Sequence, residues 1–299
     1  MSHLRSAASP EELASGLLAR IRSYGPPAVA FSGGVDSAVV AQAAWLVYGA
    51  AAVAVTAVSP SLAASERAFA ASQARAIGIR HVEIATTEFL REEYRRNAGD
   101  RCYFCKDTLY AMTHTQLSAL GVKVLLNGAN LDDAGDHRPG MLAAAEHGVR
   151  SPLLEEKLNK SAVRALATLW NLQSADKPAA PCLASRIAYG VEVTEERVGR
   201  IEKAEAWIQR TTGIRVLRVR CEQSELARIE VRPEDFAALM DPDVRERLVS
   251  ELKSLGFRAV TLDLEGFRSG NLNALLVPLG LGTHPNATSA AGAAGVNNV

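Results

Sequence analysis

The spacing of apolar residues changes along the chain and predicts its elements. Near the N-terminus they recur at helical spacing, at Leu13, Leu17, Leu18 and Ile21, which predicts a helix over residues 10–24. Short apolar runs follow without that spacing, as expected of strands buried on both faces of a sheet. We expect strands at 28–31, 51–58, 81–85 and 122–127, and helices at 36–48, 64–77, 88–97 and 106–120. Strands that alternate with helices predict an α/β fold with a doubly wound parallel sheet.

The second half of the chain has a different order of elements. Prolines interrupt residues 150–190, where one helix is expected at 161–171. A longer helix over 194–211 begins with Thr194 as N-cap. The remaining elements are expected in the order β-β-α-α-β, with strands at 216–221, 227–231 and 258–264 and helices at 233–239 and 242–255. We therefore expect one domain over 1–180, a smaller α+β domain over 181–278, and a disordered tail over 279–299.

Composition narrows the class of protein. The chain has 299 residues, 48% of them hydrophobic, which is ample for a core. The formal net charge is zero, so no nucleic-acid partner is indicated. Neither a membrane-spanning run nor an apolar signal core at the N-terminus is evident, so we expect a cytoplasmic protein without a membrane partner. In that compartment its four cysteines are expected to be reduced, metal-bound or catalytic rather than disulfide-paired.

A glycine-rich segment joins the first expected strand to the next helix, with the sequence Ser32-Gly33-Gly34-Val35-Asp36-Ser37. The two glycines allow positive φ and close approach of the backbone to a ligand. The helix N-terminus after them favours an anion such as phosphate, and Ser32 and Ser37 add hydroxyl donors. Asp36 would repel a phosphate unless a cation lay between them, and Mg²⁺ is the simplest such cation. The alternative is an ordinary turn between strand and helix.

Two other expected strands end in polar residues that can meet this segment. Ser59 follows one strand, and Asn127 and Gly128 follow another. Ligands of doubly wound sheets bind beyond the carboxyl ends of the strands, so these residues are candidates for contact with one nucleotide. Asp133 is a further candidate ligand of Mg²⁺; the alternative is that Asp132 and Asp133 cap a helix.

Three cysteines are candidates for a second centre. Cys102 and Cys105 form a C-x₂-C pair, and Cys182 stands far along the chain. The pair is compatible with half a zinc site, a redox pair, part of an iron–sulfur site, or two unliganded thiols. A fourth zinc ligand has no supporting spacing, whether at His81, His137 or Cys221. Three thiolates without a fourth suit a [4Fe–4S] cluster with one open iron.

These motifs resemble those of a known family. Residues 32–37 resemble the pyrophosphate loop of the N-type ATP pyrophosphatases, which split ATP between the α and β phosphates and transfer AMP to a substrate oxygen. Over about residues 10–278 the chain is similar to the ATP-dependent sulfur transferases that build the nickel-pincer nucleotide cofactor. The segments that carry this similarity are 100–106, 182–186, 218–220 with 227–231, and 262–273.

The resemblance implies a reaction in two stages. A carboxylate of pyridinium-3,5-biscarboxylic acid mononucleotide is adenylylated by MgATP, and sulfur then replaces AMP to give a thiocarboxylate. One branch of the family uses a single cysteine matching Cys182 as sulfur source and converts it to dehydroalanine. Another holds a [4Fe–4S] cluster and takes sulfur from a bound sulfide. Because all three cysteines are present, we expect Cys102, Cys105 and Cys182 to be cluster ligands.

The resemblance also implies roles for other side chains. Asp36, Cys182 and Arg186 are expected to be catalytic, and the substrate is expected to contact Ser185, Arg186, Arg218, Arg220, Glu205 and Asp235. Guanidinium groups suit a substrate with phosphate and carboxylates. For Arg218 and Arg220 the alternative is a solvated strand face.

Expected partners are the small nucleotide substrate, a sulfide donor or cysteine desulfurase system, other proteins of cofactor biosynthesis, and a second copy of the chain. Two readings compete with the cofactor-building sulfur transferase. One is another pyrophosphate-loop enzyme, such as a tRNA thiolase or an amide-forming synthetase. The other is a nucleotide-binding protein that holds a structural zinc ion and catalyses no reaction.

Overall fold

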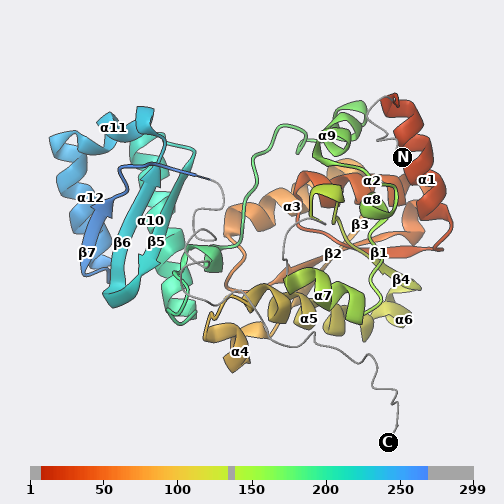
Figure 1. Ribbon diagram of the computed structural model, residues 1–299, viewed down its shortest axis with the longest axis horizontal. Coiled ribbons are helices and arrows are strands. Elements are labelled where there is room, and N and C mark those ends of the chain that lie inside the picture. The colour runs from red at the N-terminus through yellow and green to blue at the C-terminus, as the bar shows by residue number, and fades with distance from the viewer. Residues whose placement is uncertain (1–7, 134–138, 269–299) are drawn as a thin grey trace, which may run out of the picture.

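The computed structural model describes residues 8–133 and 139–268. Predictions for His137 and for the tail over 279–299 lie outside these residues. Figure 1 shows two lobes, each built around its own sheet, with the N-terminal half of the chain in one and the C-terminal third in the other. Within the described ranges, no helix combines the length and apolar character needed to cross a bilayer.

The sheet of the first lobe is parallel throughout. Its strands are β1 (Pro27–Ala30), β2 (Val53–Val58), β3 (Arg80–Ala85) and β4 (Val124–Leu126). They lie in the order β3-β2-β1-β4, and Ala28 of β1 is opposite both Val53 and Leu125. This confirms the α/β fold expected from the alternation of strands and helices. Because every strand runs the same way, the segments after β1, β2 and β4 meet at one edge of the sheet.

Helices cover both faces of this sheet, as Figure 1 shows. One face packs against α1 (Pro10–Arg22), α2 (Val35–Tyr48), α3 (Ala64–Ile77) and α9 (Lys160–Leu169), and the other against α5 (Arg101–His114) and α7 (Pro139–Glu146). Side chains alternate along each strand, so neighbours join different cores: Val29 joins the first and Ala28 the second. Shorter helices are α4 (Glu92–Arg95), α6 (Leu117–Leu120) and α8 (Pro152–Glu155).

The second lobe has the expected β-β-α-α-β order. Its strands are β5 (Leu217–Glu222), β6 (Leu226–Val231) and β7 (Ala259–Leu262), with β6 antiparallel to β5 and parallel to β7. Its helices are α10 (Glu195–Thr212), α11 (Phe236–Met240) and α12 (Pro242–Ser254). Thr194 accepts a hydrogen bond from the Arg197 N–H and so caps α10 as expected. The core of this lobe also includes Phe89 and Tyr94 from the first half of the chain.

The segment that joins the lobes is fastened to α3. Buried Gln73 donates from Nε2 to the Ser174 hydroxyl, at 2.8 Å. Lys177 pairs with Glu66 at 2.6 Å and lies 3.6 Å from the centre of the Phe69 ring. Two residues of the connection therefore bind the same helix, which fixes the point at which the chain enters the second lobe.

Two predicted helices, over 88–97 and 106–120, are each divided in the structure, the second into α5 and α6. The helix expected over 88–97 is broken into a 3₁₀ turn over Glu88–Leu90 and α4, and Asn97 follows with a φ of 55°. The helix expected to start at 106 begins at Arg101, because the Tyr103 N–H already donates to the Asp100 carbonyl. The cysteine pair thus lies in the first turns of α5 and not in a loop before it. Residues 3 apart share one face of a helix, so Cys102 and Cys105 are neighbours.

Candidate active site

The glycine loop connects β1 to α2 in a conformation that requires small residues. Gly33 has a φ of 75°, and a Cβ there would lie 2.9 Å from the Ala70 Cα in α3. Gly34 is the N-cap of α2 and carries no side-chain cap. The Ser37 hydroxyl ties the loop together, accepting from the Ser32 N–H at 3.2 Å and donating to the Gly34 carbonyl at 3.0 Å. The loop therefore presents backbone at the start of a helix, as an anion site requires.

Asp36 in the first turn of α2 is held by two donors. The Lys160 ammonium lies 2.5 Å from one of its oxygens, and the Asn130 side-chain amide donates to the other at 3.0 Å. Lys160 is a site residue that sequence reasoning missed. A cation in the first turn of a helix opposes the helix dipole, and that unfavourable position is the signal that could have found it.

The segment after β4 packs directly against the glycine loop. A Cβ on Gly128 would lie 2.8 Å from the Ser37 backbone nitrogen, so only glycine allows this approach. The Asn127 side-chain oxygen accepts from the Ala129 N–H and from the Ser151 hydroxyl, at 3.1 and 2.8 Å. Two of the three strand ends selected from the sequence are thus in contact.

Asp132 and Asp133 bind backbone groups at the same edge. Asp132 accepts from the Lys160 N–H at 2.8 Å, at the start of α9, although the N-cap of that helix is Asn159. Asp133 accepts from the Asn130 N–H at 3.0 Å. Asp36 and Asp133 are therefore both bonded to Asn130. Mg²⁺ commonly uses one or two carboxylates together with phosphate and water, and these two side chains fit that requirement.

Ser59, at the end of β2, lines a pocket of about 430 Å³. Its walls are largely apolar, with Val58, Pro60 and Leu62 on one side, while Arg67 and Glu83 form an ion pair at 2.6 Å. Such a lining suits a flat ring with a few polar groups. The same turn reaches the Cys182 segment, because the Ser61 carbonyl accepts from the Leu183 N–H at 2.8 Å.

The three candidate cysteines share one neighbourhood. Cys182 is exposed and is the N-cap of the 3₁₀ turn over Leu183–Arg186, while Cys102 is exposed on α5. Burial raises the pKa of the Cys105 thiol to about 12; Lys106 opposes this shift, and Cys182 and Cys102 add to it. Within the described ranges no three His, Cys, Asp or Glu side chains form a ready-made metal site. Three thiols that affect one another nevertheless have the donor chemistry of an iron–sulfur site.

Arg186 joins the Cys182 turn to the second lobe. Its Nε and Nη2 donate to the two oxygens of Glu205, at 3.1 and 3.3 Å, and its Nη1 donates to the carbonyls of Pro181 and Cys182. Glu205 also accepts from the Val219 N–H at 3.0 Å. Glu205 therefore binds both the turn and strand β5, and its expected contact with the substrate stays a prediction.

Arg220 is buried and bound to a carboxylate that no water reaches. It donates from Nε and Nη2 to Glu230, at 3.0 and 2.8 Å, and from Nη1 to the Ser185 carbonyl at 2.9 Å. Glu230 is fully buried and also accepts from Arg228 at 2.7 Å. A solvated strand face is therefore wrong for Arg220. Sequence reasoning gave Glu230 and Arg228 no role. The pairing of β5 with β6 brings them to the arginines, because it places Arg218 opposite Glu230 and Arg220 opposite Arg228.

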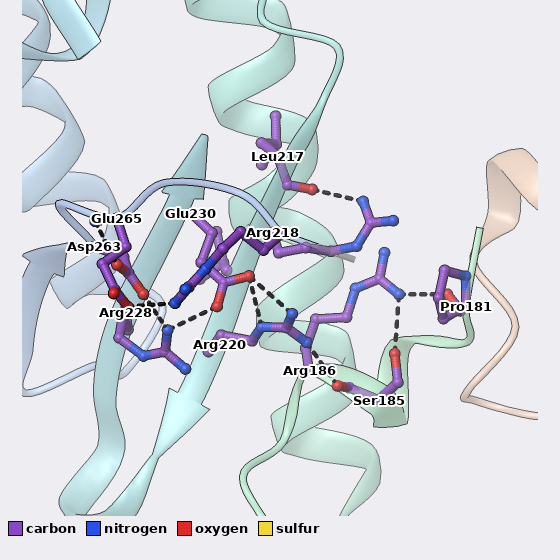
Figure 2. A network of polar contacts seen from close by, with 12 residues as sticks. Pro181, Ser185, Arg186, Leu217, Arg218, Arg220, Arg228, Glu230, Asp263 and Glu265 are labelled. Atoms are coloured by element: carbon purple, nitrogen blue, oxygen red, sulfur yellow. Dashed lines mark hydrogen bonds and ion pairs between the residues drawn. The ribbon is translucent and has the colours of Figure 1, made fainter. Parts of the chain in front are cut away.

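Figure 2 shows Arg218 joined to the Leu217 carbonyl, whereas Arg220 and Arg228 are joined to Glu230. Among the described residues no carboxylate pairs with Arg218; its Nη1 donates to the Leu217 carbonyl at 2.7 Å, and Phe267 lies against its guanidinium. Burial lowers the pKa of Arg218 to about 10, and the positive charge of Arg186 adds to the shift. A half-buried cation beside a second cation is a favourable place for an anionic ligand.

Asp235 is placed apart from this group by its contacts. Its carboxylate pairs with Arg232 at 3.1 Å, and within the described residues it forms no hydrogen bond or ion pair with Arg186, Arg218 or Arg220. Its expected role at the substrate stays a prediction.

The fold and the loop define an ATP-using α/β enzyme with a pyrophosphate loop. Residues 11–136 match the family model described as asparagine synthase. The chain is 46% identical over 248 residues to an uncharacterized protein of Synechocystis, covering 83% of this chain and 92% of the relative. It is 36% identical over 272 residues to the pyridinium-3,5-bisthiocarboxylic acid mononucleotide synthase of Lactiplantibacillus plantarum, covering 89% of this chain and 96% of that protein. The chain therefore belongs to the family of that synthase.

Gly128→Ala tests the contact between the two strand ends. Because its Cβ would clash with the backbone of the loop, we expect ATP affinity to fall about tenfold, in line with the cost of overpacking. Calorimetric titration with MgATP measures this. Gly199→Ala in α10 is the matched control, since a Cβ there meets nothing within 4 Å. Equal ATP affinity in both variants would contradict the assignment of the loop.

Thiol reactivity tests the surroundings of the cysteines. The thiolate is the reactive form, and burial raises the pKa of Cys105 to about 12 and of Cys221 to about 11. In metal-free protein at pH 8 we expect iodoacetamide to label exposed Cys102 and Cys182 first, with Cys105 and Cys221 gaining reactivity as the pH rises above 9. Peptide mass mapping follows each site. Labelling of Cys105 as fast as Cys182 at pH 8 would contradict the burial described here.

Proposed function

We propose that this chain is an ATP-dependent sulfur transferase that converts a carboxylate of pyridinium-3,5-biscarboxylic acid mononucleotide to a thiocarboxylate, releasing pyrophosphate and AMP. One observation carries the proposal: the Cys182 turn is bonded on one side to Ser61, beyond the end of β2, and on the other to Glu205 in the second lobe, through Arg186. Arg186 lies there with Arg218 and Arg220, and these three residues are called the arginine cluster. Membership in the synthase family supports the choice of substrate.

The first stage uses the glycine loop. A substrate carboxylate oxygen attacks the α-phosphorus of ATP, the bond to the bridging oxygen breaks, and pyrophosphate leaves into the loop formed by Ser32, Gly33, Gly34 and Ser37. Asp36 and Asp133 are the residues that would hold Mg²⁺, whose charge offsets that of the phosphates. Lys160 is bound to Asp36 and provides a second positive charge within reach of the same phosphates.

The substrate is bound by the arginine cluster. Arg186 and Arg220 are oriented by Glu205 and Glu230, whereas no carboxylate within residues 8–133 and 139–268 forms an ion pair with Arg218. A guanidinium binds a phosphate or carboxylate with two parallel hydrogen bonds, so Arg218 is suited to an anionic group of the nucleotide. Ser185 belongs to the same turn and lies beside Arg186.

Sulfur enters at the Cys182 turn. Cys102, Cys105 and Cys182 are the residues that would hold a [4Fe–4S] cluster, which would supply sulfide in a form that stays deprotonated at neutral pH. The sulfur atom attacks the carbonyl carbon of the acyl-adenylate, and AMP leaves with the carboxylate oxygen. The exposure of Cys182 favours one alternative, in which its own sulfur is transferred and dehydroalanine remains.

Product analysis tests the reaction. With the pyridinium nucleotide and MgATP, we expect AMP, pyrophosphate and a mass gain equal to sulfur in place of oxygen. Cys102→Ala should abolish multiple turnovers if the cluster supplies sulfur, because one ligand is lost. If Cys182 is the donor instead, mass spectrometry should find it converted to dehydroalanine after one turnover. Failure to form AMP with this substrate would refute the proposed function.

Arg218→Met tests the binding of the anionic substrate. Because one charge-assisted hydrogen-bonding group is lost, we expect KM for the nucleotide to rise about tenfold while KM for ATP is unchanged. Steady-state kinetics with each substrate varied in turn measure both values. Arg245→Met, an exposed position on α12, is the control. An unchanged KM for the nucleotide in Arg218→Met would contradict the proposed binding site.

A further inference from the structure

Arg101 is a buried charged residue with no role in the reaction described so far. It opens α5, directly before Cys102, and is 6% exposed. Buried arginines are normally paired with a carboxylate. No carboxylate of the described ranges pairs with Arg101. Its Nη1 instead donates to the Asn97 side-chain oxygen at 2.6 Å and to the Ala184 carbonyl at 2.9 Å.

Asn97 also forms hydrogen bonds with the segment that follows Ala184. It is fully buried and has a φ of 55°, a conformation that asparagine tolerates better than most residues. Its Nδ2 donates to the carbonyls of Ala188 and Val191, at 2.9 and 3.1 Å. Its own carbonyl accepts from the Gly190 N–H at 3.1 Å. The Asn97 side chain therefore satisfies backbone carbonyls of the segment over 187–191, in addition to the bridge that joins Ile187 to Cys221.

The bond from Arg101 to Ala184 joins the two parts of the chain that carry the thiols. Arg101 is adjacent to Cys102, and Ala184 is two residues beyond Cys182, although the bonded residues are separated by 83 positions. We propose that Arg101, oriented by Asn97, is a positioning residue that fixes the Cys182 turn against the helix that carries Cys102 and Cys105. Its importance for sulfur transfer rests on the proposed function.

The geometry explains why an arginine stands here. A single nitrogen makes both hydrogen bonds, so losing it leaves the buried Asn97 oxygen and the Ala184 carbonyl without this donor. Buried acceptors without a partner favour rearrangement of the segment that carries them. Lysine keeps the charge and a donor but is shorter, so Arg101→Lys should restore part of the positioning. Methionine fills the space and donates nothing.

Cross-linking measures this positioning without any reaction of ATP. The full-length protein, reduced and freed of metal by a chelator, is treated with dibromobimane, which becomes fluorescent when it bridges two neighbouring thiols. Peptide mapping then shows whether Cys182 is linked to Cys102 or Cys105. In Arg101→Met we expect this link to form about tenfold more slowly, the loss corresponding to one hydrogen bond of a charged group. The cross-linking rate of Arg101→Lys should fall between those of the wild type and Arg101→Met.

Arg200→Met is the matched control. Arg200 is also buried, at 7% exposed, but it pairs with Glu196 and Glu225 in the second lobe, where the neighbouring thiol is Cys221 and not one of the three candidate ligands. We expect it to cross-link at the wild-type rate. Equal rates in wild type and Arg101→Met would overturn the proposal. Slow cross-linking in Arg200→Met as well would also overturn it, because the effect would then be one of general stability.

A second readout separates this proposal from the proposed function. With nucleotide substrate and MgATP, Arg101→Met should release pyrophosphate at the wild-type rate while sulfur incorporation falls. If wild-type protein makes no thiocarboxylate, the proposed function fails, yet the cross-linking result still decides the role of Arg101. Equal losses of pyrophosphate release and sulfur incorporation would overturn the positioning role.

Discussion

The short turn that begins at Cys182 depends on hydrogen bonds to both lobes, and the candidate active site depends on that turn. Its Leu183 N–H binds the end of β2, Arg186 binds Glu205 of α10, and the Ala184 carbonyl binds Arg101 of α5. These three contacts join the turn to three different parts of the chain, in addition to the hydrogen bonds that its own residues make with one another. The turn belongs to no sheet or long helix, so its position depends on these hydrogen bonds, as expected of a functional loop on a rigid scaffold.

This arrangement brings two chemical environments together. The edge of the parallel sheet provides backbone N–H donors and the side chains of Asp36 and Lys160. Together these groups suit phosphates and a divalent cation. The second lobe provides guanidinium groups that are mostly neutralised by buried carboxylates, with Arg218 left for an anion. In the proposed reaction, a carboxylate activated in the first environment belongs to a substrate bound by the second. The Cys182 turn is hydrogen-bonded both to Ser61, beyond β2, and to Glu205 of α10, as activation followed by sulfur delivery would require.

Much of the fold and part of the candidate site could be predicted from the local sequence pattern, but contacts between distant residues could not. The parallel sheet was predictable because strands buried on both faces appear as short apolar runs, and the glycine loop because its residues are adjacent in sequence. The start of α5 was not, because residues 101–105 carry no apolar periodicity and Asp100 makes no side-chain cap. Lys160 and Arg101 were missed for another reason. The contacts that place them at the site, with Asp36 and with the Ala184 carbonyl, span 124 and 83 residues, beyond the reach of any motif.

The central claim is that one carboxylate is first adenylylated and then attacked by sulfur at the same site. The most direct measurement uses substrate whose carboxylate oxygens are ¹⁸O. Attack on the α-phosphorus places one of these oxygens between carbon and phosphorus, and departure of AMP carries it away. The account predicts that each AMP formed with a thiocarboxylate contains one ¹⁸O atom, seen by mass spectrometry. AMP without the label would show that ATP is cleaved without activating the carboxylate, and would contradict the account.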